Sequence, residues 1–446
     1  MDKIEYKLNQ VAVILITMWI AIPLFRVRVG VIFFILLFFL WLITSDTKWL
    51  IQKLSWSLLF VLTFFITFIP YVIVGKLQYG AAGVNIIIVN FPLFFVGLFI
   101  NHYYMFYKKD YKTLGKIAFY FLLFFTIGAL QTYFGLLTYP MASRQLATGL
   151  PEFSEMYNRM GIGGFGFIYS GTFLLLAILY MFLMKRNLFS LKYKILIVLS
   201  IVIISLMLLK ASFATSILIT FCGVLLILFV RSKLTLVITV LFTVISITFI
   251  SESLIAKFFL GIANYFSEDP ILKEKFTDLA STFLYSSLDG QTGNRFDLYV
   301  SSLKVFLGNP FFGIYGPFGD QNASLVGGHS GWFDLLAYYG LFTSIPLFIA
   351  LYYNFKIHFS LLKKMKFHVY LTILYFLIFV FGLINPILYV YEIGFVLFCI
   401  IPAIPFIPYA FKTNALAETK KEKSDQTNED IMARQYSPAR SMSTNG

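Results

Sequence analysis

The chain has 446 residues, of which 59% are hydrophobic and only 13% are charged. A soluble protein of this length exposes far more charge, so the composition excludes an ordinary soluble fold. The formal net charge is +14. Lys and Arg are spread over short segments between apolar runs, which indicates a membrane topology signal and argues against nucleic acid as a partner.

Continuous apolar runs of about 18 or more residues recur along the chain, which is the length a helix needs to cross a bilayer. They do not alternate in polarity, so helices are expected and not barrel strands. We therefore predict an all-α polytopic membrane helical bundle of about 12 transmembrane helices with a large external helical loop. The expected spans are 10–25, 27–44, 54–74, 82–100, 117–138, 161–184, 195–209, 212–230, 234–250, 331–354, 369–388 and 390–411.

The first span follows two lysines and lacks a small-residue cleavage site, so we interpret it as a signal anchor. Arg26 and Arg28 predict a tight turn before the second span. Cys222 and Cys399 fall inside apolar runs and are interpreted as small buried hydrophobic residues, not as a disulfide.

Basic residues gather in every second connecting segment. These segments are the N-terminus, 45–53, 101–116, 185–194, 231–233 and 355–368. The positive-inside rule makes them cytoplasmic, with both chain termini on the cytoplasmic side of the membrane. The expected organisation is 1–250 for nine helices with an external loop at 139–160, 251–330 for a large external (periplasmic) loop, 331–411 for three helices, and 412–446 for a disordered cytoplasmic tail.

The loop 251–330 has helical patterning of its own. Asp269 and Pro270 form a good helix start, and apolar residues follow them at helical spacing. A second helix is expected from residue 294 and is stopped by Gly308, Asn309 and Pro310. The segment 251–266 is also amphipathic. The loop is therefore predicted to form a small helical cap.

Four cationic side chains and one histidine on the expected outer face are candidate site residues. Arg144 and Arg159 bracket the loop 139–160, and Lys210 occupies a tight hairpin. Arg295 lies in the first turn of the second cap helix, and His329 precedes a helix start, where backbone N–H groups favour anions. Each alone also fits a structural role, such as an interfacial Arg on lipid phosphate. The other histidines, His102, His358 and His368, adjoin lysine-rich loops and are interpreted as structural.

Several cations and one histidine beside a membrane indicate an anionic, lipid-attached substrate. Guanidinium groups bind phosphate oxygens and stabilise a pyrophosphate leaving group as its bond breaks. A neutral His can act as a general base on an acceptor hydroxyl. Acidic residues are scattered and no phosphate-binding GxxxxGK[ST] motif occurs. We therefore expect metal-independent group transfer without a cofactor.

The segment 293–341 carries a recognisable order of motifs. They are Arg295, Asn309-Pro310, Gly313, His329-Ser330 and Tyr339-Gly340-Leu341. This order resembles the O-antigen polymerase and O-antigen ligase superfamily. The first external loop, with SRQLATG at 143–149 and RMGIGGFGFIYS at 159–170, resembles that of exopolysaccharide polymerases.

The resemblance implies a Wzy-like polysaccharide polymerase, a glycosyltransferase that joins repeat units carried on undecaprenyl pyrophosphate. It implies a catalytic His329 and an Arg295 that contacts pyrophosphate, with Arg144, Arg159 and Lys210 as further pyrophosphate- or glycan-binding residues. Lys210 stands where related ligases carry Arg, which keeps the charge and loses the bidentate fork. The expected partners are the lipid-linked oligosaccharide, membrane lipids, a chain-length regulator and a flippase.

Two alternatives stay open from the sequence. An O-antigen ligase would pass finished polymer to a lipid A core and shares the same motifs. A lipid-linked oligosaccharide flippase or other transporter would carry ionisable groups near mid-membrane and internal repeats. Pro70, Pro92 and Pro346 interrupt spans, but few charges accompany them and no repeat is evident. These features favour the enzyme.

Overall fold

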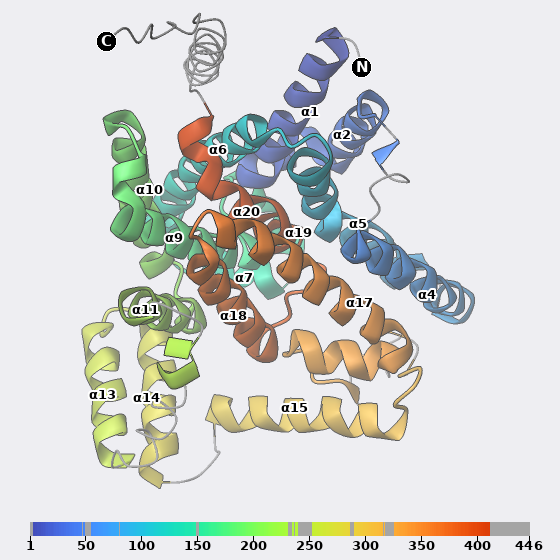
Figure 1. The fold of residues 1–446 in the computed structure, drawn as a ribbon. Helices are drawn as coiled ribbons and strands as arrows, with labels where there is room; N and C mark the ends of the chain where they lie inside the picture. Colours follow the sequence, from blue (N-terminus) through green and yellow to red (C-terminus); the bar gives the residue numbers. More distant parts are fainter. Residues whose placement is uncertain are drawn as a thin grey trace, which may run out of the picture.

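The computed structural model describes residues 3–46, 48–49, 55–79, 81–148, 151–230, 234–235, 237–239, 252–285, 290–314, 316 and 325–410. Within these ranges every regular element is a helix, which confirms the predicted all-α class. The helices form one bundle, and a group of three further helices packs against one end of it (Figure 1).

The bundle helices are α1 (Lys3–Ala21), α2 (Pro23–Thr44), α4 (Trp56–Tyr79), α5 (Ala81–His102), α6 (Tyr111–Thr138), α7 (Ala142–Thr148), α8 (Pro151–Arg159), α9 (Phe165–Lys185), α10 (Leu191–Lys210), α11 (Ala214–Phe229), α17 (Gly331–Lys364), α18 (His368–Ile384), α19 (Tyr391–Phe395) and α20 (Ile401–Ala403). Short connections join the bundle helices, except that the group of three further helices lies between α11 and α17 in the chain. The chain continues from α19 through a π-helical turn into α20 and a final 3₁₀ segment, Ile404–Tyr409.

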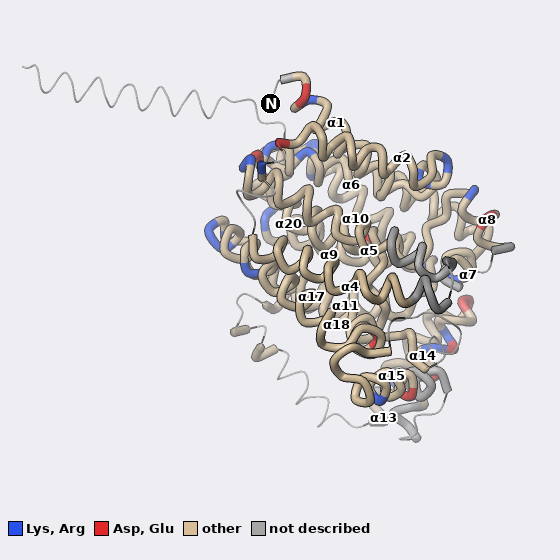
Figure 2. The backbone as a smooth tube through the Cα atoms, turned by 90° about the vertical axis from the view of Figure 1, so that its right-hand side faces the viewer, with Lys and Arg blue, Asp and Glu red and all other residues tan. Residues whose placement is uncertain are grey.

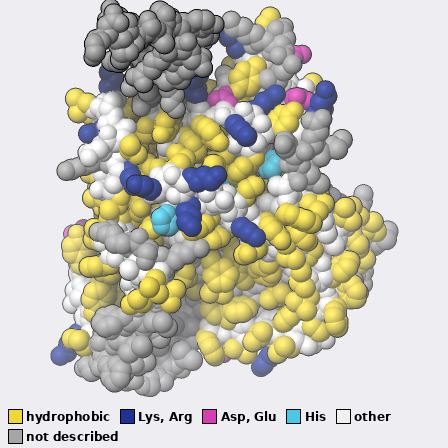
Figure 3. All heavy atoms as spheres, viewed as in Figure 1, with side chains coloured by type: hydrophobic (Ala, Val, Ile, Leu, Met, Phe, Trp, Pro, Cys, Tyr) yellow, Lys and Arg dark blue, Asp and Glu magenta, His cyan; other side chains and the backbone are white. Residues whose placement is uncertain are grey.

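In the described part of the chain, eight helical stretches are long and apolar enough to cross a membrane. Two further apolar helices, α11 and α18, have 16 and 17 residues. Charged residues lie mainly at helix ends and in connections (Figure 2). Apolar side chains cover the exposed faces of α4 and α17 (Figure 3). The protein is therefore a helical membrane protein. The count of twelve stays a prediction, and the expected span 234–250 lies largely outside the described residues.

The first turn of the bundle lies earlier than predicted. Ile22 has extended backbone angles and Pro23 starts α2, a position where the missing N–H of proline costs nothing. Arg26 and Arg28 lie inside α2. The prediction that they form the turn is wrong, because Pro23 already fixes the helix start.

Two predicted loops are largely helical. In place of a loop at 101–116, α5 continues through a π-helical turn, Tyr103–Tyr107, and α6 begins after Asp110, which accepts a hydrogen bond from Thr113 N. In place of a loop at 355–368, α17 runs to Lys364. Lysine favours helix and can extend its charge into water, so a helix can continue past the apolar layer.

The connections divide between two ends of the bundle. At one end, Tyr6 of α1 donates a hydrogen bond to Asp110, and Tyr111 stacks on Phe406 with ring centroids 4.8 Å apart. The start of α1 and the last described segment therefore lie at the same end of the bundle, on either side of α6 (Figure 1). At the other end, the turn after α10 meets the start of α14 through a hydrogen bond from Ser212 to Asp269.

The α13–α15 cap consists of α13 (Glu252–Tyr265), α14 (Pro270–Tyr285) and α15 (Gly290–Gly308). Asp269 accepts hydrogen bonds from Ile271 N and Leu272 N, both at 3.1 Å, so it caps α14 as predicted. Leu272 and Phe276 are fully buried against Ala263 and Ala214, in a small core separate from that of the bundle. The cap is thus a packed unit that rests on α11.

Candidate functional site

A cavity of about 1110 Å³ lies between the bundle and the cap. Its walls come from α5, α7, the start of α9, the turn before α11, the first turns of α14, the turn before α17, the segment that joins α18 to α19, and the start of α19. Arg144 and His329, predicted from two loops far apart in sequence, both line it. We call it the Arg144–His329 cavity.

Arg144 projects from the short helix α7. The neighbouring Ser143 fixes that helix by donating to Gly163 O at 2.6 Å, while Gly163 N donates to Thr132 of α6 at 3.0 Å. The guanidinium of Arg144 lies 5.9 Å from the ring centroid of Phe213, another cavity residue. Arg144 is half-buried. Its guanidinium group therefore contacts the Phe213 ring on one side and is only partly hydrated.

The turn between α10 and α11 connects this wall to the cap. Ser212 is buried and adopts a left-handed conformation with φ 57°, and its hydroxyl donates to Asp269. Asp269 in turn caps α14, whose Lys275 and Glu274 line the cavity. In the predicted hairpin, Ser212 is thus the residue that joins the bundle to the cap. Lys210 is exposed and is not among the cavity residues.

His329 sits in a tightly fixed turn before α17. Gly328 has φ +69°, and Ser330 caps α17 by accepting from Phe333 N at 3.2 Å. Buried Asp334 accepts from Ser330 N at 2.9 Å and from the Ser302 hydroxyl of α15 at 2.7 Å. Asp334 therefore fixes the backbone that carries His329 and ties it to the cap.

The segment 385–392 forms the wall beside His329, since Gly331 N donates to Asn385 O at 3.0 Å. The Asn385 amide nitrogen is buried without a partner among the described residues. Tyr389 has φ 75°, a strained backbone for a bulky residue, and burial raises the pKa of its phenol, which remains a hydrogen-bond donor. Glu392 forms an ion pair with Arg26 at 2.5 Å. This wall offers donors and a carboxylate, as polyhydroxylated ligands require.

An apolar groove of about 460 Å³ between α4 and α5 adjoins the cavity. Phe91 lines the groove and lies edge-on to Tyr389 of the cavity, with ring centroids 4.5 Å apart. Exposed Ile66 and Ile69 continue the groove along α4. The two hollows are therefore separated by one aromatic pair.

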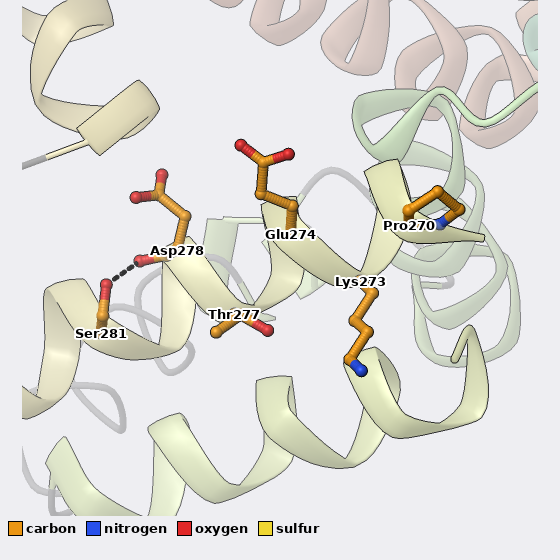
Figure 4. Close-up of a pocket in the computed structure, with 6 residues that line it drawn as sticks. All are labelled: Pro270, Lys273, Glu274, Thr277, Asp278 and Ser281. Atoms are coloured by element: carbon orange, nitrogen blue, oxygen red, sulfur yellow. Dashed lines mark hydrogen bonds between the residues drawn. The ribbon is translucent and has the colours of Figure 1, made fainter. Parts of the chain in front are cut away.

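A third, shallower hollow of about 410 Å³ lies along α14 (Figure 4). The carboxylates of Glu274 and Asp278 point to one side of the helix and Lys273 points to the other. Lys273 is exposed and is not a residue of the Arg144–His329 cavity, whereas Lys275 is. The two lysines therefore differ in placement on one helix.

Three of the motifs in the segment 293–341 pack against one another. Leu341 N donates to Pro310 O at 2.8 Å, and α17 is kinked at Gly340, with φ +62°. A Cβ on Gly340 would lie 2.4 Å from the Phe311 backbone, so only glycine fits. Asn309-Pro310, Gly313 and Tyr339-Gly340-Leu341 thus form a structural junction that seats α17 under the cap.

The structure brings two of the five candidate residues together. Arg159 ends α8, is 72% exposed and pairs with Glu155 at 2.6 Å, away from the cavity lining. Arg295 lies within α15, but its side chain is outside the part of the structure that is described. Among the described residues, no three His, Cys, Asp or Glu side chains converge as metal ligands.

Lys275, Glu392 and Arg26 were missed from the sequence. Glu392 carried a usable signal, because an acidic residue at the start of an apolar span indicates a paired or functional group. Lys275 carried none, since lysines are common on amphipathic helices. No protein-family model and no curated protein matches this chain. The helical membrane fold and the Arg144–His329 cavity are therefore the features that bear on its function.

Proposed function

We propose that this protein is a polysaccharide polymerase of the O-antigen polymerase and ligase type, which joins repeat units carried on undecaprenyl pyrophosphate. One observation carries the proposal. Arg144 and His329, drawn from two separate loops, line the same large cavity beside apolar, membrane-spanning helices.

Two cations of the cavity suit the donor. Arg144 and Lys275 are positioned to bind the pyrophosphate of a lipid-linked glycan, because guanidinium and ammonium groups complement phosphate oxygens. Their charge stabilises the leaving group most when the sugar–phosphate bond breaks. The apolar groove beyond Phe91 suits the hydrocarbon chain of the same lipid.

The wall formed by 385–392 suits the acceptor sugar. The Asn385 amide and the Glu392 carboxylate can hold hydroxyl groups next to His329. In the reaction, the acceptor oxygen attacks the anomeric carbon of the donor while the bond to pyrophosphate breaks. His329 takes the hydroxyl proton, and the lipid pyrophosphate leaves as an anion.

The proposal places the cavity at the outer face of the bacterial cytoplasmic membrane and both chain ends in the cytoplasm. In a chain with Cys222 and Cys399 replaced by Ala, Asp278→Cys at the cap and Lys192→Cys at the other end probe this orientation. An impermeant maleimide on intact cells should label only the first. Labelling of Lys192→Cys alone would reverse the topology.

A glycan gel from the native host tests the function. We expect Arg144→Ala, Lys275→Ala and His329→Ala to remove long polysaccharide while the protein stays in the membrane. Lys273→Ala, on the same helix as Lys275, should leave the ladder unchanged. A deletion strain with single repeat units on its surface lipid indicates a polymerase. A strain that lacks surface glycan and accumulates lipid-linked polymer indicates the ligase instead. Normal ladders from all three cavity variants would refute the site.

A further inference from the structure

A narrow groove of about 310 Å³ lies between α1 and α6, at the end of the bundle away from the Arg144–His329 cavity. Lys7 of α1 and Lys116 of α6 stand at its rim. Val11 and Ile14 follow Lys7 at four and seven residues along α1, so they line the same helix face farther in. We call it the α1–α6 groove.

The two helices are held together across the groove. Gln10 donates to the Thr113 hydroxyl at 2.5 Å, and both residues line the groove. Both helices begin at this end of the bundle, so their lysines lie at one level and their apolar residues at a deeper one. Cations above an apolar slot match the arrangement of a lipid phosphate above its acyl chains.

Nearby acids leave the two lysines available to a ligand. Asp110 already accepts hydrogen bonds from Tyr6, Thr113 N and the Thr113 hydroxyl. Glu5 lies two residues from Lys7, on the other side of α1. Neither lysine has a carboxylate of the described residues within 4.0 Å.

We propose that the α1–α6 groove binds an anionic phospholipid. Its phosphate contacts Lys7 and Lys116, and one acyl chain lies along Val11 and Ile14. This binding site is independent of the proposed glycan transfer, because it lies at the opposite end of the bundle.

Native mass spectrometry of the delipidated full chain tests the site. Phosphatidylglycerol and phosphatidylcholine with the same acyl chains are the probes. We expect the wild type to prefer phosphatidylglycerol, and Lys7→Gln and Lys116→Gln each to weaken its binding about 5-fold. The matched control is Lys192→Gln on α10, which removes one charge outside the groove, as each test variant does inside it. Equal loss in that control, or no preference in the wild type, would overturn the proposal.

Two further arms separate a lipid from a free anion. Inorganic phosphate at millimolar concentration should leave bound phosphatidylglycerol in place. Displacement of the lipid by phosphate would contradict a lipid site. Ile14→Trp fills the apolar part of the groove. It should reduce retention of long-chain phosphatidylglycerol and spare a dihexanoyl analogue, while unchanged retention of both would contradict the acyl-chain placement.

Discussion

Arg26 in α2 and Glu392 in α19 form an ion pair at 2.5 Å, although 366 positions separate them in the chain. Their side chains are 17% and 9% exposed, and the guanidinium also lies over the Tyr391 ring. This pair fastens the N-terminal hairpin to one wall of the Arg144–His329 cavity. Glu392 itself lines the cavity.

Breaking this pair should be costly because one charge stays behind in a poorly hydrated place. We expect Arg26→Ala to lower the free energy of unfolding by roughly 3 kcal/mol. The double variant Arg26→Gln/Glu392→Gln should lose less than the sum of its single variants. Denaturant unfolding in detergent measures both effects, and strictly additive losses would show that the two residues do not act as a pair.

Asp334 should act as a positioning residue for His329. In Asp334→Asn an amide N–H replaces one of two acceptors that face Ser330 N and the Ser302 hydroxyl. The mismatch should cost about 1–3 kcal/mol of stability and shift the pH profile of transfer, since the turn carrying His329 moves. Ser302→Ala removes one of these contacts and should have a smaller effect. A variant Asp334→Asn with an unchanged pH profile would limit Asp334 to a structural role.

Gly166 makes room for the acceptor wall. A Cβ there would lie 2.5 Å from Val390 Cγ1 and 2.6 Å from Glu392 Oε2, so one of them must shift. We expect Gly166→Ala to raise the acceptor KM strongly at little cost in melting temperature. Gly164→Ala is the control, because its Cβ would meet Leu146 at an ordinary 3.4 Å. Equal acceptor KM values for the two variants would argue against Glu392 as an acceptor ligand.

Asp46 should make stability depend on acid pH. The hydrogen bond from Tyr107 lowers the pKa of the Asp46 carboxyl in the folded protein. Its stabilising contribution is therefore present above the unfolded-state pKa of about 3.9 and is lost as pH falls through the lower folded value. Melting temperatures across acid pH should show a steeper fall for the wild type than for Asp46→Asn. Parallel curves of melting temperature against pH for the two proteins would show that Asp46 does not cause this pH dependence.

Much of the fold follows from local sequence. Long apolar runs predict the helices, and Asp269 with Pro270 predicts the start of α14, because capping depends on neighbouring residues alone. Alternation of basic loops predicts that Arg144 and His329 belong to the same end of the bundle, where they line one cavity.

The features that the sequence does not predict depend on contacts between distant segments of the chain. The Arg26–Glu392 pair cannot be read from either helix by itself. Lys275 faces the cavity only because Ser212 anchors the start of α14 through Asp269. The role of Gly340 also requires the backbone near Pro310 to pack against it.

The most direct measurement is glycan transfer by the purified protein in liposomes supplied with the undecaprenyl-pyrophosphate-linked repeat unit of its host. We predict polymer from the wild type and from Lys273→Ala, and none from Arg144→Ala or His329→Ala at equal folded protein. Polymer formed at the wild-type rate by both cavity variants would contradict the assignment of the Arg144–His329 cavity as the transfer site.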